Sequence, residues 1–356
     1  MTMRKKHSPL KFLITGALVL TIASVFVYLY VYQNLKARGP LGETVMVSVE
    51  QGDLLKDVTS TLKEHKLIGE TFIVEIYAKY MKVTDFKAGV YKIDKGWDAL
   101  KILTYMTSSA NAQNDVALTI IPGDWAKDVA FALESITDYS ANEILAYWND
   151  PTVFEALDQA YEVISAEAKK TGVKVLLEGY LMPETYFIDP ESSLEVITKR
   201  VLDQTEAFYL DHRTEFDQSD FSVHEIFTLA SIVQFEASKE TDMKMVTQVF
   251  INRLDLPMRL QSNVTICYAL YNYTDWKDCE GNKDIDSPYN TYLHDGLPLG
   301  PIDNPSVKAI LATLNPTPND YFFFLADVYG DGTVYYTKTY AEHLKLVCKY
   351  LEVGCG

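Results

Sequence analysis

Three hydrophobic patterns follow one another along the chain. Residues 12–32 form an apolar run without a charge, residues 44–108 alternate between strand and helix periods, and residues 115–351 combine amphipathic helices with short strands. A helix period repeats apolar side chains at i, i+3, i+4 and i+7, whereas a half-buried strand repeats them at every second position. The chain is therefore predicted to be an α+β protein with an apolar N-terminal helix, a small module and a mixed α+β domain.

The apolar run at residues 12–32 has the length of a transmembrane helix, because about 20 apolar residues cross a bilayer core. Arg4, Lys5, Lys6 and Lys11 precede it, and only Lys36 and Arg38 follow closely. This bias predicts a cytoplasmic tail at residues 1–11 and an extracytoplasmic remainder, in the periplasm or on the outer face. A cleaved signal peptide is the competing interpretation, but the run is longer than a signal core and no small-x-small site follows. We predict a retained single-pass anchor in the cytoplasmic (inner) membrane.

The segment at residues 44–108 is predicted to be a β-α-α-β unit followed by a helix, with strands at 45–49 and 87–93. Its second helix carries Phe72, Ile76 and Tyr80 at helical spacing. The segment has no convergent set of catalytic residue types, so we interpret it as a spacer or a carbohydrate-contacting module. A polar stretch at residues 108–115 is predicted to link it to the second domain.

A helix predicted to begin at Ser222 is central to the second domain. Ser222 and Glu225 have the spacing of a capping box, and an apolar face follows at Ile226, Leu229, Ala230 and Val233. Glu236 continues this face at a position where the pattern requires an apolar side chain. Since the run contains no Gly or Pro, the helix is expected to continue to Thr241.

A carboxylate on an apolar face loses hydration, which raises its pKa and keeps a general acid protonated near neutral pH. The alternative is that Glu236 emerges into solvent, either hydrated or paired with Lys239. Periodicity alone favours this structural interpretation, because structural carboxylates outnumber catalytic ones. The helix pattern therefore makes Glu236 a candidate general acid, and it leaves open whether the residue is catalytic or structural.

Residues 260–305 are predicted to be mostly loop, rich in Asn, Asp, Tyr, Pro and Gly, and long loops in a compact domain are usually functional. Asn304 and Pro305 are expected to begin the helix that reaches Leu314. Motifs of serine hydrolases, zinc proteases and nucleotide-binding proteins are absent from the sequence. The polar and aromatic side chains are of the types that bind sugars, so acid-catalysed glycosidic cleavage fits them. No cofactor and no metal are expected.

The charge balance excludes nucleic acid as a partner. Six of the 32 basic residues lie at or before Arg38 and all 49 acidic residues lie beyond it, which leaves a net charge of −23 on the residues after Arg38. Nucleic-acid binding requires basic patches. The same balance disfavours docking of the whole domain onto anionic lipid.

The four cysteines lie in the last third of the chain. Cys267 with Cys279, and Cys348 with Cys355, are close enough in sequence to close small loops in an oxidising compartment. Zinc ligation is a rival interpretation, but the spacings are poor for it. Structural disulfides or free thiols are preferred.

Five motifs carry a resemblance to a known family: ASIVQFEASKE, VFINRL, LQSNVTICYAL, DSPYNTY and GLPLGPIDNP. In this order they resemble the YceG-like family, the endolytic murein transglycosylases of bacterial cell walls. The resemblance covers the chain from about Val45 to its end. It implies a LysM-like module at 44–108, a transglycosylase domain at 115–351, and cleavage of nascent peptidoglycan glycan strands to 1,6-anhydro-N-acetylmuramic acid ends. Cell-wall synthases of elongation or division are the implied protein partners.

The family's catalytic glutamate lies in a segment with two candidate positions, occupied here by Gln234 and Glu236. Because glutamine cannot donate and recover a proton, Glu236 is the predicted catalytic residue. Substrate binding is predicted for Glu184, Asn252, Arg253, Gln261, Ser262, Tyr289, Asn290 and Thr291, with loop hydrogen bonds to backbone as the alternative role. Asn263 stands where the family usually has Asp, Leu299 where it has Pro and Asn315 where it often has His, and the first of these changes bears on activity.

Two other functions compete with the transglycosylase. A hydrolytic muramidase would use water in place of the sugar's own C6 hydroxyl. A membrane-anchored peptidoglycan-binding adaptor would have lost catalysis, and Gln234 and Asn263 are the residues that support it.

Overall fold

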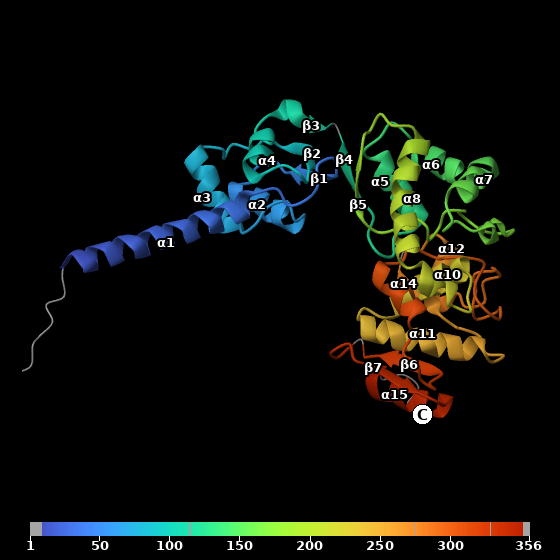
Figure 1. Ribbon diagram of the computed structural model, residues 1–356. Coiled ribbons are helices and arrows are strands. Elements are labelled where there is room, and N and C mark those ends of the chain that lie inside the picture. Colours follow the sequence, from blue (N-terminus) through green and yellow to red (C-terminus); the bar gives the residue numbers. More distant parts are fainter. Residues whose placement is uncertain (1–8, 114, 274, 328, 352–356) are drawn as a thin grey trace, which may run out of the picture. The chain divides into compact units, whose positions relative to one another are not determined.

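The computed structural model describes residues 9–113, 115–273, 275–327 and 329–351, with side chains from residue 18 onward. The chain divides into two compact units, the N-terminal unit Met1–Val116 and the C-terminal unit Ala117–Gly356. Each unit has a hydrophobic core of its own, and both contain helices and strands (Figure 1). The predicted α+β class is confirmed.

The N-terminal helix α1, Pro9–Leu35, extends three residues beyond each end of the predicted apolar run. Within it, residues 18–35 are apolar and long enough to cross a membrane by composition and length. Their side chains are mostly exposed. The residues 1–8, including Arg4, Lys5 and Lys6, lie outside the described residues, so the orientation in a membrane stays a prediction.

The rest of the N-terminal unit follows the predicted β-α-α-β order with a final helix. Its elements are β1 (Thr44–Val49), α2 (Leu55–Glu64), α3 (Thr71–Met81), β2 (Gly89–Asp94) and α4 (Ala99–Tyr105). Strands β1 and β2 are antiparallel, with partners from Thr44 with Asp94 to Val49 with Gly89. The core lies between this sheet and the helices and includes Val47, Val58, Leu62, Tyr91 and Ile102.

The polar stretch after α4 is more ordered than predicted. It forms a short 3-10 helix, Ser109–Asn111, and a third strand β3, Ala112–Gln113, which pairs with β2. Gly89 explains the close approach, because a Cβ on Gly89 would lie 2.7 Å from the Cβ of Ala112. The stretch at residues 108–115, predicted to be a linker or loop, therefore includes a short strand of the N-terminal sheet.

The first half of the C-terminal unit contains two short paired strands and several helices. Its elements are β4 (Val116–Thr119), α5 (Ala126–Glu134), α6 (Ala141–Trp148), α7 (Pro151–Ala160), a 3-10 turn (Ala166–Lys169), β5 (Thr185–Ile188), α8 (Leu194–Asp211) and α9 (Arg213–Asp217). Strand β4 pairs with β5. The backbone N–H of Ile120 also donates to the carbonyl oxygen of Glu184 at 2.9 Å, which brings the 120–124 loop beside Glu184.

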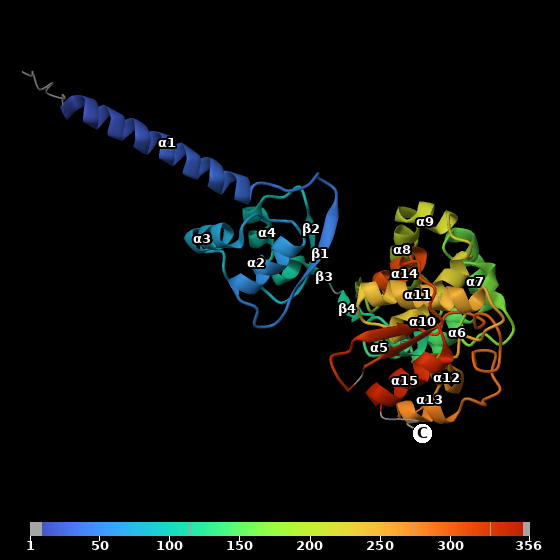
Figure 2. The same cartoon turned by 90° about the horizontal axis from the view of Figure 1, so that it is seen from below.

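Three helices form the centre of the second half: α10 (Val223–Glu236), α11 (Glu240–Leu254) and α14 (Val307–Leu314). They pack against one another, and both views show them together (Figures 1 and 2). Around them lie α12 (Asn263–Leu270), α13 (Trp276–Gly281), the antiparallel hairpin β6 (Phe323–Ala326) and β7 (Val334–Thr337), and α15 (Tyr340–Leu351).

The capping box of α10 is confirmed, but the predicted end of the helix is wrong. Ser222 Oγ accepts from the Glu225 N–H, and a Glu225 carboxylate oxygen accepts from the Ser222 N–H at 2.9 Å. The helix stops at Glu236, and Ala237 is extended with φ −150° and ψ 145°. The break has no Gly or Pro in its sequence. We attribute it to packing, since α10 and α11 both contact α14. The break leaves Glu236 as the last residue of α10.

Two further expectations are corrected in residues 260–314. Helices α12 and α13 occupy much of the predicted loop; residues 264–269 of α12 are buried on all sides, so the helix has no amphipathic period that reveals it. Ser306, not Asn304, caps α14 through a hydrogen bond from the Ala309 N–H. Asn304 is instead fully buried, and its amide bonds to the backbone of Leu181 and Asp124.

A disulfide joins Cys267 of α12 to Cys279 of α13 and closes the first predicted loop. Both cysteines are buried. Cys348 is disulfide-bonded as well, whereas Cys355, its predicted partner, lies outside the described residues.

Candidate active site around Glu236

Glu236 lies at the end of α10, half-buried, with its carboxyl group held by one hydrogen bond. Ser262 Oγ donates to Glu236 Oε1 at 2.6 Å. Ser262 is itself buried and is fixed by its backbone, because its N–H donates to Thr291 Oγ1 and its carbonyl oxygen accepts from Thr265 Oγ1. The residue that precedes α12 therefore orients the carboxyl at the end of α10.

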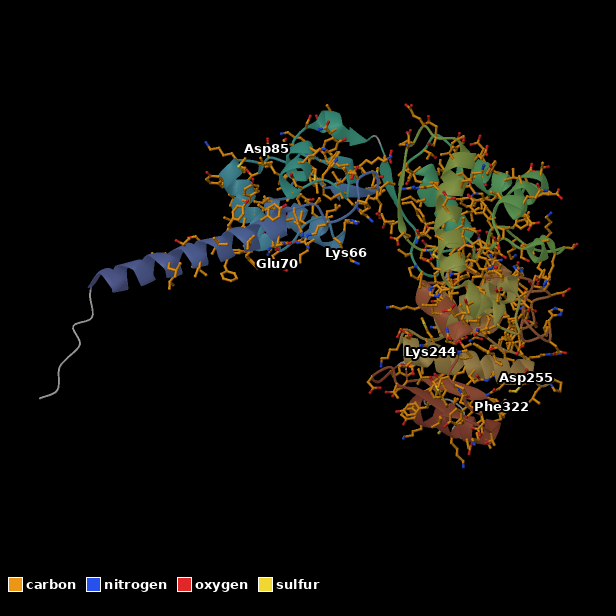
Figure 3. All side chains as sticks on the ribbon, viewed as in Figure 1. Lys66, Glu70, Asp85, Lys244, Asp255 and Phe322 are labelled. Carbon is orange, nitrogen blue, oxygen red and sulfur yellow. A yellow bond between two sulfur atoms is a disulfide. The ribbon has the colours of Figure 1, made fainter. Side chains whose placement is uncertain are left out.

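The environment of Glu236 favours its protonated form. Burial of the carboxyl raises the pKa of Glu236, while the Ser262 hydrogen bond and the positive charge of Arg253 oppose this effect in part. Arg253, which is 7% exposed, donates from Nε to the carbonyl oxygen of Phe322 at 2.7 Å and from Nη1 to that of Leu260. Phe322 is labelled near α11 in Figure 3. A raised carboxyl pKa beside fixed donors is typical of a general acid.

Two cavities meet at Glu236. The larger, of about 850 Å³, is lined by Glu184, Gln234, Asp242, Ser306 and Lys308 among others. The smaller, of about 390 Å³, is lined by Arg253, Gln261, Ser262, Asn263, Tyr292, Trp276 and His343 among others. Phe235 and Glu236 line both. An extended ligand could therefore occupy space on both sides of the Glu236 carboxyl.

The structure brings five of the nine predicted site residues to these cavities. Glu184 lines the larger cavity, Arg253, Gln261 and Ser262 line the smaller one, and Glu236 lines both. Glu184 is exposed, and its Oε1 accepts from the Thr185 N–H at 3.0 Å. Gln261 adopts a left-handed conformation with φ +52°, and its N–H donates to the Thr291 carbonyl oxygen at 3.1 Å.

The other four predicted residues line neither cavity and hold loops together. Asn252 ties α11 to the segment before β6, since its Nδ2 donates to the carbonyl oxygens of Asn319 and Tyr321. Asn290 is fully buried; its Nδ2 donates to two loop carbonyls and its Oδ1 accepts from the Tyr292 N–H. Tyr289 is 1% exposed and packs edge-on against another aromatic ring. Thr291 does not contact Glu236; its Oγ1 accepts from the N–H of Ser262, which in turn bonds to Glu236.

Gln234 and Asn263, two of the departures from the family pattern, line different cavities. Gln234 Oε1 accepts from the Ser306 N–H at 3.0 Å, at the start of α14. Asn263 lines the smaller cavity, and its Oδ1 accepts from Tyr292 Oη at 2.6 Å. Gln234 thus joins two helices at the edge of the larger cavity, whereas Asn263 faces the smaller one.

Phe235 was missed by the sequence argument, although it stands between the two candidate acid positions. It is 52% exposed and lines both cavities. Its ring covers Gly123, where an added Cβ would lie 2.9 Å from the ring Cζ. The sequence signal was a large aromatic residue that lies off the buried face of α10.

We expect Phe235→Ala to raise KM by about 5- to 30-fold with little change in kcat. Loss of an apolar contact of this size with a bound ligand would amount to about 1–2 kcal/mol, and binding lost equally from substrate and transition state changes KM alone. Steady-state kinetics on glycan strands test this, with Phe131→Ala as the matched control, because Phe131 is 57% exposed and lines neither cavity. A fall in kcat at unchanged KM would contradict a binding role.

Comparison with known proteins adds to this geometry. The sequence model of the YceG-like family matches residues 47–349. The chain belongs to the YceG-like family. An endolytic murein transglycosylase of Bacillus subtilis is 34% identical over 314 residues, covering 87% of this chain and 85% of that one. One from Streptococcus pneumoniae is 32% identical over 362 residues, covering 96% of this chain and 65% of that one.

A solved structure agrees with the family assignment. A YceG-like protein of Listeria monocytogenes superposes with a TM-score of 0.60 at 32% identity, covering 85% of this chain and 99% of that chain. The predicted membership of the YceG-like family is confirmed, and the match spans both units. Among the described residues, no group of three or more His, Cys, Asp and Glu side chains is placed to hold a metal ion.

Proposed function

We propose that this YceG-like chain is an endolytic murein transglycosylase that cuts the bond between N-acetylmuramic acid and N-acetylglucosamine in nascent glycan strands. The observation that carries this proposal is a single acid, Glu236, with a raised pKa between two cavities. Cavities on both sides of the acid suit a cut within a strand. The named relatives support the same reaction class.

In the proposed reaction, protonated Glu236 donates its proton to the bridging glycosidic oxygen as the bond to C1 breaks. The substrate's own 2-acetamido group shares the positive charge that develops at C1. Deprotonated Glu236 then takes the proton of the C6 hydroxyl, whose oxygen bonds to C1 and closes the 1,6-anhydro ring. One carboxyl acts first as acid and then as base, so the second carboxylate of most glycosidases is not required.

Ser262 and Arg253 would stabilise the carboxylate that forms after the first proton transfer. Ser262 donates directly to Glu236 Oε1, and the charge of Arg253 favours the same ionised form. Gln261 and Asn263 line the same cavity and present amides suited to acetamido and hydroxyl groups. Asn252, Tyr289, Asn290 and Thr291 would support these contacts indirectly through the loops that they hold.

The remaining features of the proposal concern location. We propose that α1 anchors the chain in the cytoplasmic membrane, that residues 44–108 form a LysM-like module, and that residues 115–351 form the catalytic domain outside the cytoplasm. The reaction would end the elongation of a strand, so cell-wall synthases are the expected neighbours. The acidic C-terminal unit gives no reason to expect nucleic acid.

Mass spectrometry of products from nascent, uncrosslinked glycan tests the reaction. We expect internal cuts and anhydro ends, which are lighter than reducing ends by one water. Reducing ends would establish the hydrolytic muramidase instead. Binding without any products would favour the non-catalytic adaptor, for which Gln234 and Asn263 would then be the explanation.

The pH profile should respond to Ser262. The Ser262 hydrogen bond lowers the pKa of Glu236, so Ser262→Ala is expected to raise that pKa further. Because Glu236 must be protonated when the reaction starts, the alkaline limb of the kcat/KM profile should move to higher pH. Ser238→Ala, beside the acid in the larger cavity, is the control and should leave the limb in place. A limb that moves to lower pH in Ser262→Ala would contradict this assignment.

A further inference from the structure

Helix α3 exposes an apolar stripe that the N-terminal unit leaves uncovered. Phe72, Ile76 and Tyr80, which we call the α3 stripe, are 68%, 52% and 80% exposed. The face of α3 that packs into the unit instead carries Val74 and Ala78, both fully buried. The apolar side chains of the α3 stripe therefore do not contribute to the core of the unit.

The beginning of α3 is fixed to the end of α1. The backbone N–H of Glu70, at the N-cap of α3, donates to Asn34 Oδ1 at 2.8 Å, and the Gly69 N–H donates to the Asn34 carbonyl oxygen at 3.1 Å. Asn34 is 7% exposed. A Cβ on Gly69 would lie 2.7 Å from Asn34 Cα, so only glycine permits this approach. Figure 3 labels Glu70 at this junction.

From this junction α3 runs back beside α1. Tyr77, two turns further along α3, lines a cavity of about 330 Å³ together with Tyr28, Val31, Tyr32 and Leu35 of α1. Lys36, just after α1, and Asp98 and Leu100, at the start of α4, complete its lining. Helices α1 and α3 are therefore in contact near the end of α1, and both views show α3 close to that end (Figures 1 and 2). Tyr28 and Tyr32 stack at 6.4 Å and fall where an aromatic belt marks the membrane interface. This places the α3 stripe at the depth of the lipid headgroups.

The charges around the stripe suit a lipid surface. Lys79 and Lys82 are exposed on α3 and Lys36 and Arg38 on the adjoining chain, whereas the acidic Glu70 is paired with Lys63 at 2.9 Å and Glu75 lies 3.4 Å from Thr59 Oγ1. Residues 36–116 hold eleven basic and eleven acidic residues, while residues 117–356 hold 17 and 38. The acidity that disfavours anionic lipid therefore belongs to the C-terminal unit alone.

We infer that the α3 stripe inserts into the extracytoplasmic headgroup layer as an interfacial helix, with Phe72, Ile76 and Tyr80 toward the acyl chains and Lys79 and Lys82 toward anionic headgroups. The inference rests on the membrane anchorage by α1 proposed above. Anchor and α3 together would hold the N-terminal unit against the bilayer at a fixed depth. The occupant of the stripe is thus phospholipid and not a second protein.

Site-specific photocrosslinking of the full-length chain tests the inference. Benzoylphenylalanine placed singly at residues 72, 76 and 80 is expected to give lipid adducts in nanodiscs that contain phosphatidylglycerol, at several-fold higher yield than at residues 131 and 329. Phe131 and Tyr329 are matched controls, since both are exposed aromatics of the C-terminal unit. The double variant Lys79→Gln with Lys82→Gln should lower the adduct yield several-fold in these nanodiscs and have less effect in phosphatidylcholine alone.

Three results would overturn the inference. These are adducts between two chains, adducts to another protein, or yields at the α3 stripe equal to those of the controls. Extraction of membranes with alkaline carbonate separates this failure from failure of the anchor: a chain that is extracted lacks the anchor, whereas a retained chain without lipid adducts disproves only the role of α3. Lipid adducts form without substrate, so the result is independent of transglycosylase activity.

Discussion

Replacing Glu236 with Gln is expected to lower kcat by about 10²- to 10⁴-fold, the contribution of a positioned acid–base group. Glutamine has nearly the same shape and its amide oxygen still accepts from Ser262 Oγ, which bonds Glu236 Oε1 at 2.6 Å. It cannot give a proton to the glycosidic oxygen or remove one from the C6 hydroxyl. Release of anhydro-ended glycan, measured per enzyme on nascent strands, should therefore fall while glycan binding is retained.

Glu240→Gln is the matched control for this experiment. Glu240 begins α11 four residues further on, pairs with Lys244 at 2.7 Å and lines neither cavity. It should keep its activity, and both variants should melt at the temperature of the parent. Full activity in Glu236→Gln would move the acid elsewhere, and Glu184 and Asp242 would become the candidates because they are the other carboxylates on the larger cavity.

Gln234→Glu separates the two positions of the family segment. A carboxylate at residue 234 would replace the amide that accepts from the Ser306 N–H, and it would keep that hydrogen bond. If only Glu236 performs the chemistry, Gln234→Glu in a Glu236→Gln background should stay inactive. Recovery of turnover in that double variant would instead show that the first position can serve as the acid.

Local rules predicted α10 because each of its signals acts over a few residues. The capping box of Ser222 and Glu225 and the apolar face behind it depend on neighbours at i+3 and i+4. They placed Glu236 correctly on the helix. They could not predict the break after it, since that break follows from contacts of α10 and α11 with α14, about 70 residues further along the chain.

Side-chain composition was a weaker guide to the cavity walls. Sugar binding and a loop hydrogen bond to backbone were both open for the polar loop residues. For Asn290 the structure shows the second role, because the residue is buried and its amide donates to backbone carbonyls that would otherwise be unpaired. Tyr289 is buried as well. Phe235 was not among the predicted site residues, although its half-exposed side chain lines both cavities. Which polar side chain faces solvent depends on tertiary packing, and the sequence does not contain that information locally.

A second large effect is expected away from the site, at the buried Glu178. Its side chain accepts from the Ala126 N–H at 2.8 Å and from Tyr268 Oη at 3.0 Å, and the residue is 2% exposed. Burial raises the pKa of Glu178 to about 8. Asp303 is fully buried too; its two carboxyl oxygens have no hydrogen-bond partner among the described residues, and burial holds its pKa well above the usual range.

The sign of the stability change follows from this raised pKa. The folded state holds the Glu178 proton up to about pH 8, whereas the unfolded chain releases it near pH 4.3. The stability that this group contributes is therefore complete below about pH 4 and is lost between about pH 4 and pH 8, at up to about 1.4 kcal/mol per pH unit. Near pH 7 the accumulated loss is about 2–4 kcal/mol.

Glu178→Gln should remove this loss, because the amide is neutral at every pH and still accepts from the Ala126 N–H. We expect the variant to be more stable than the parent by about 2–4 kcal/mol at pH 7 and to match it near pH 4. Calorimetric melting of the C-terminal unit across this range measures the difference. Asp303→Asn should also raise the stability at pH 7. If the stability of the parent and of Glu178→Gln changed with pH at the same slope, Glu178 would be shown to ionise freely in the folded state. Since neither carboxyl lines either of the two cavities at Glu236, transglycosylase activity at pH 7 should be unchanged by either substitution.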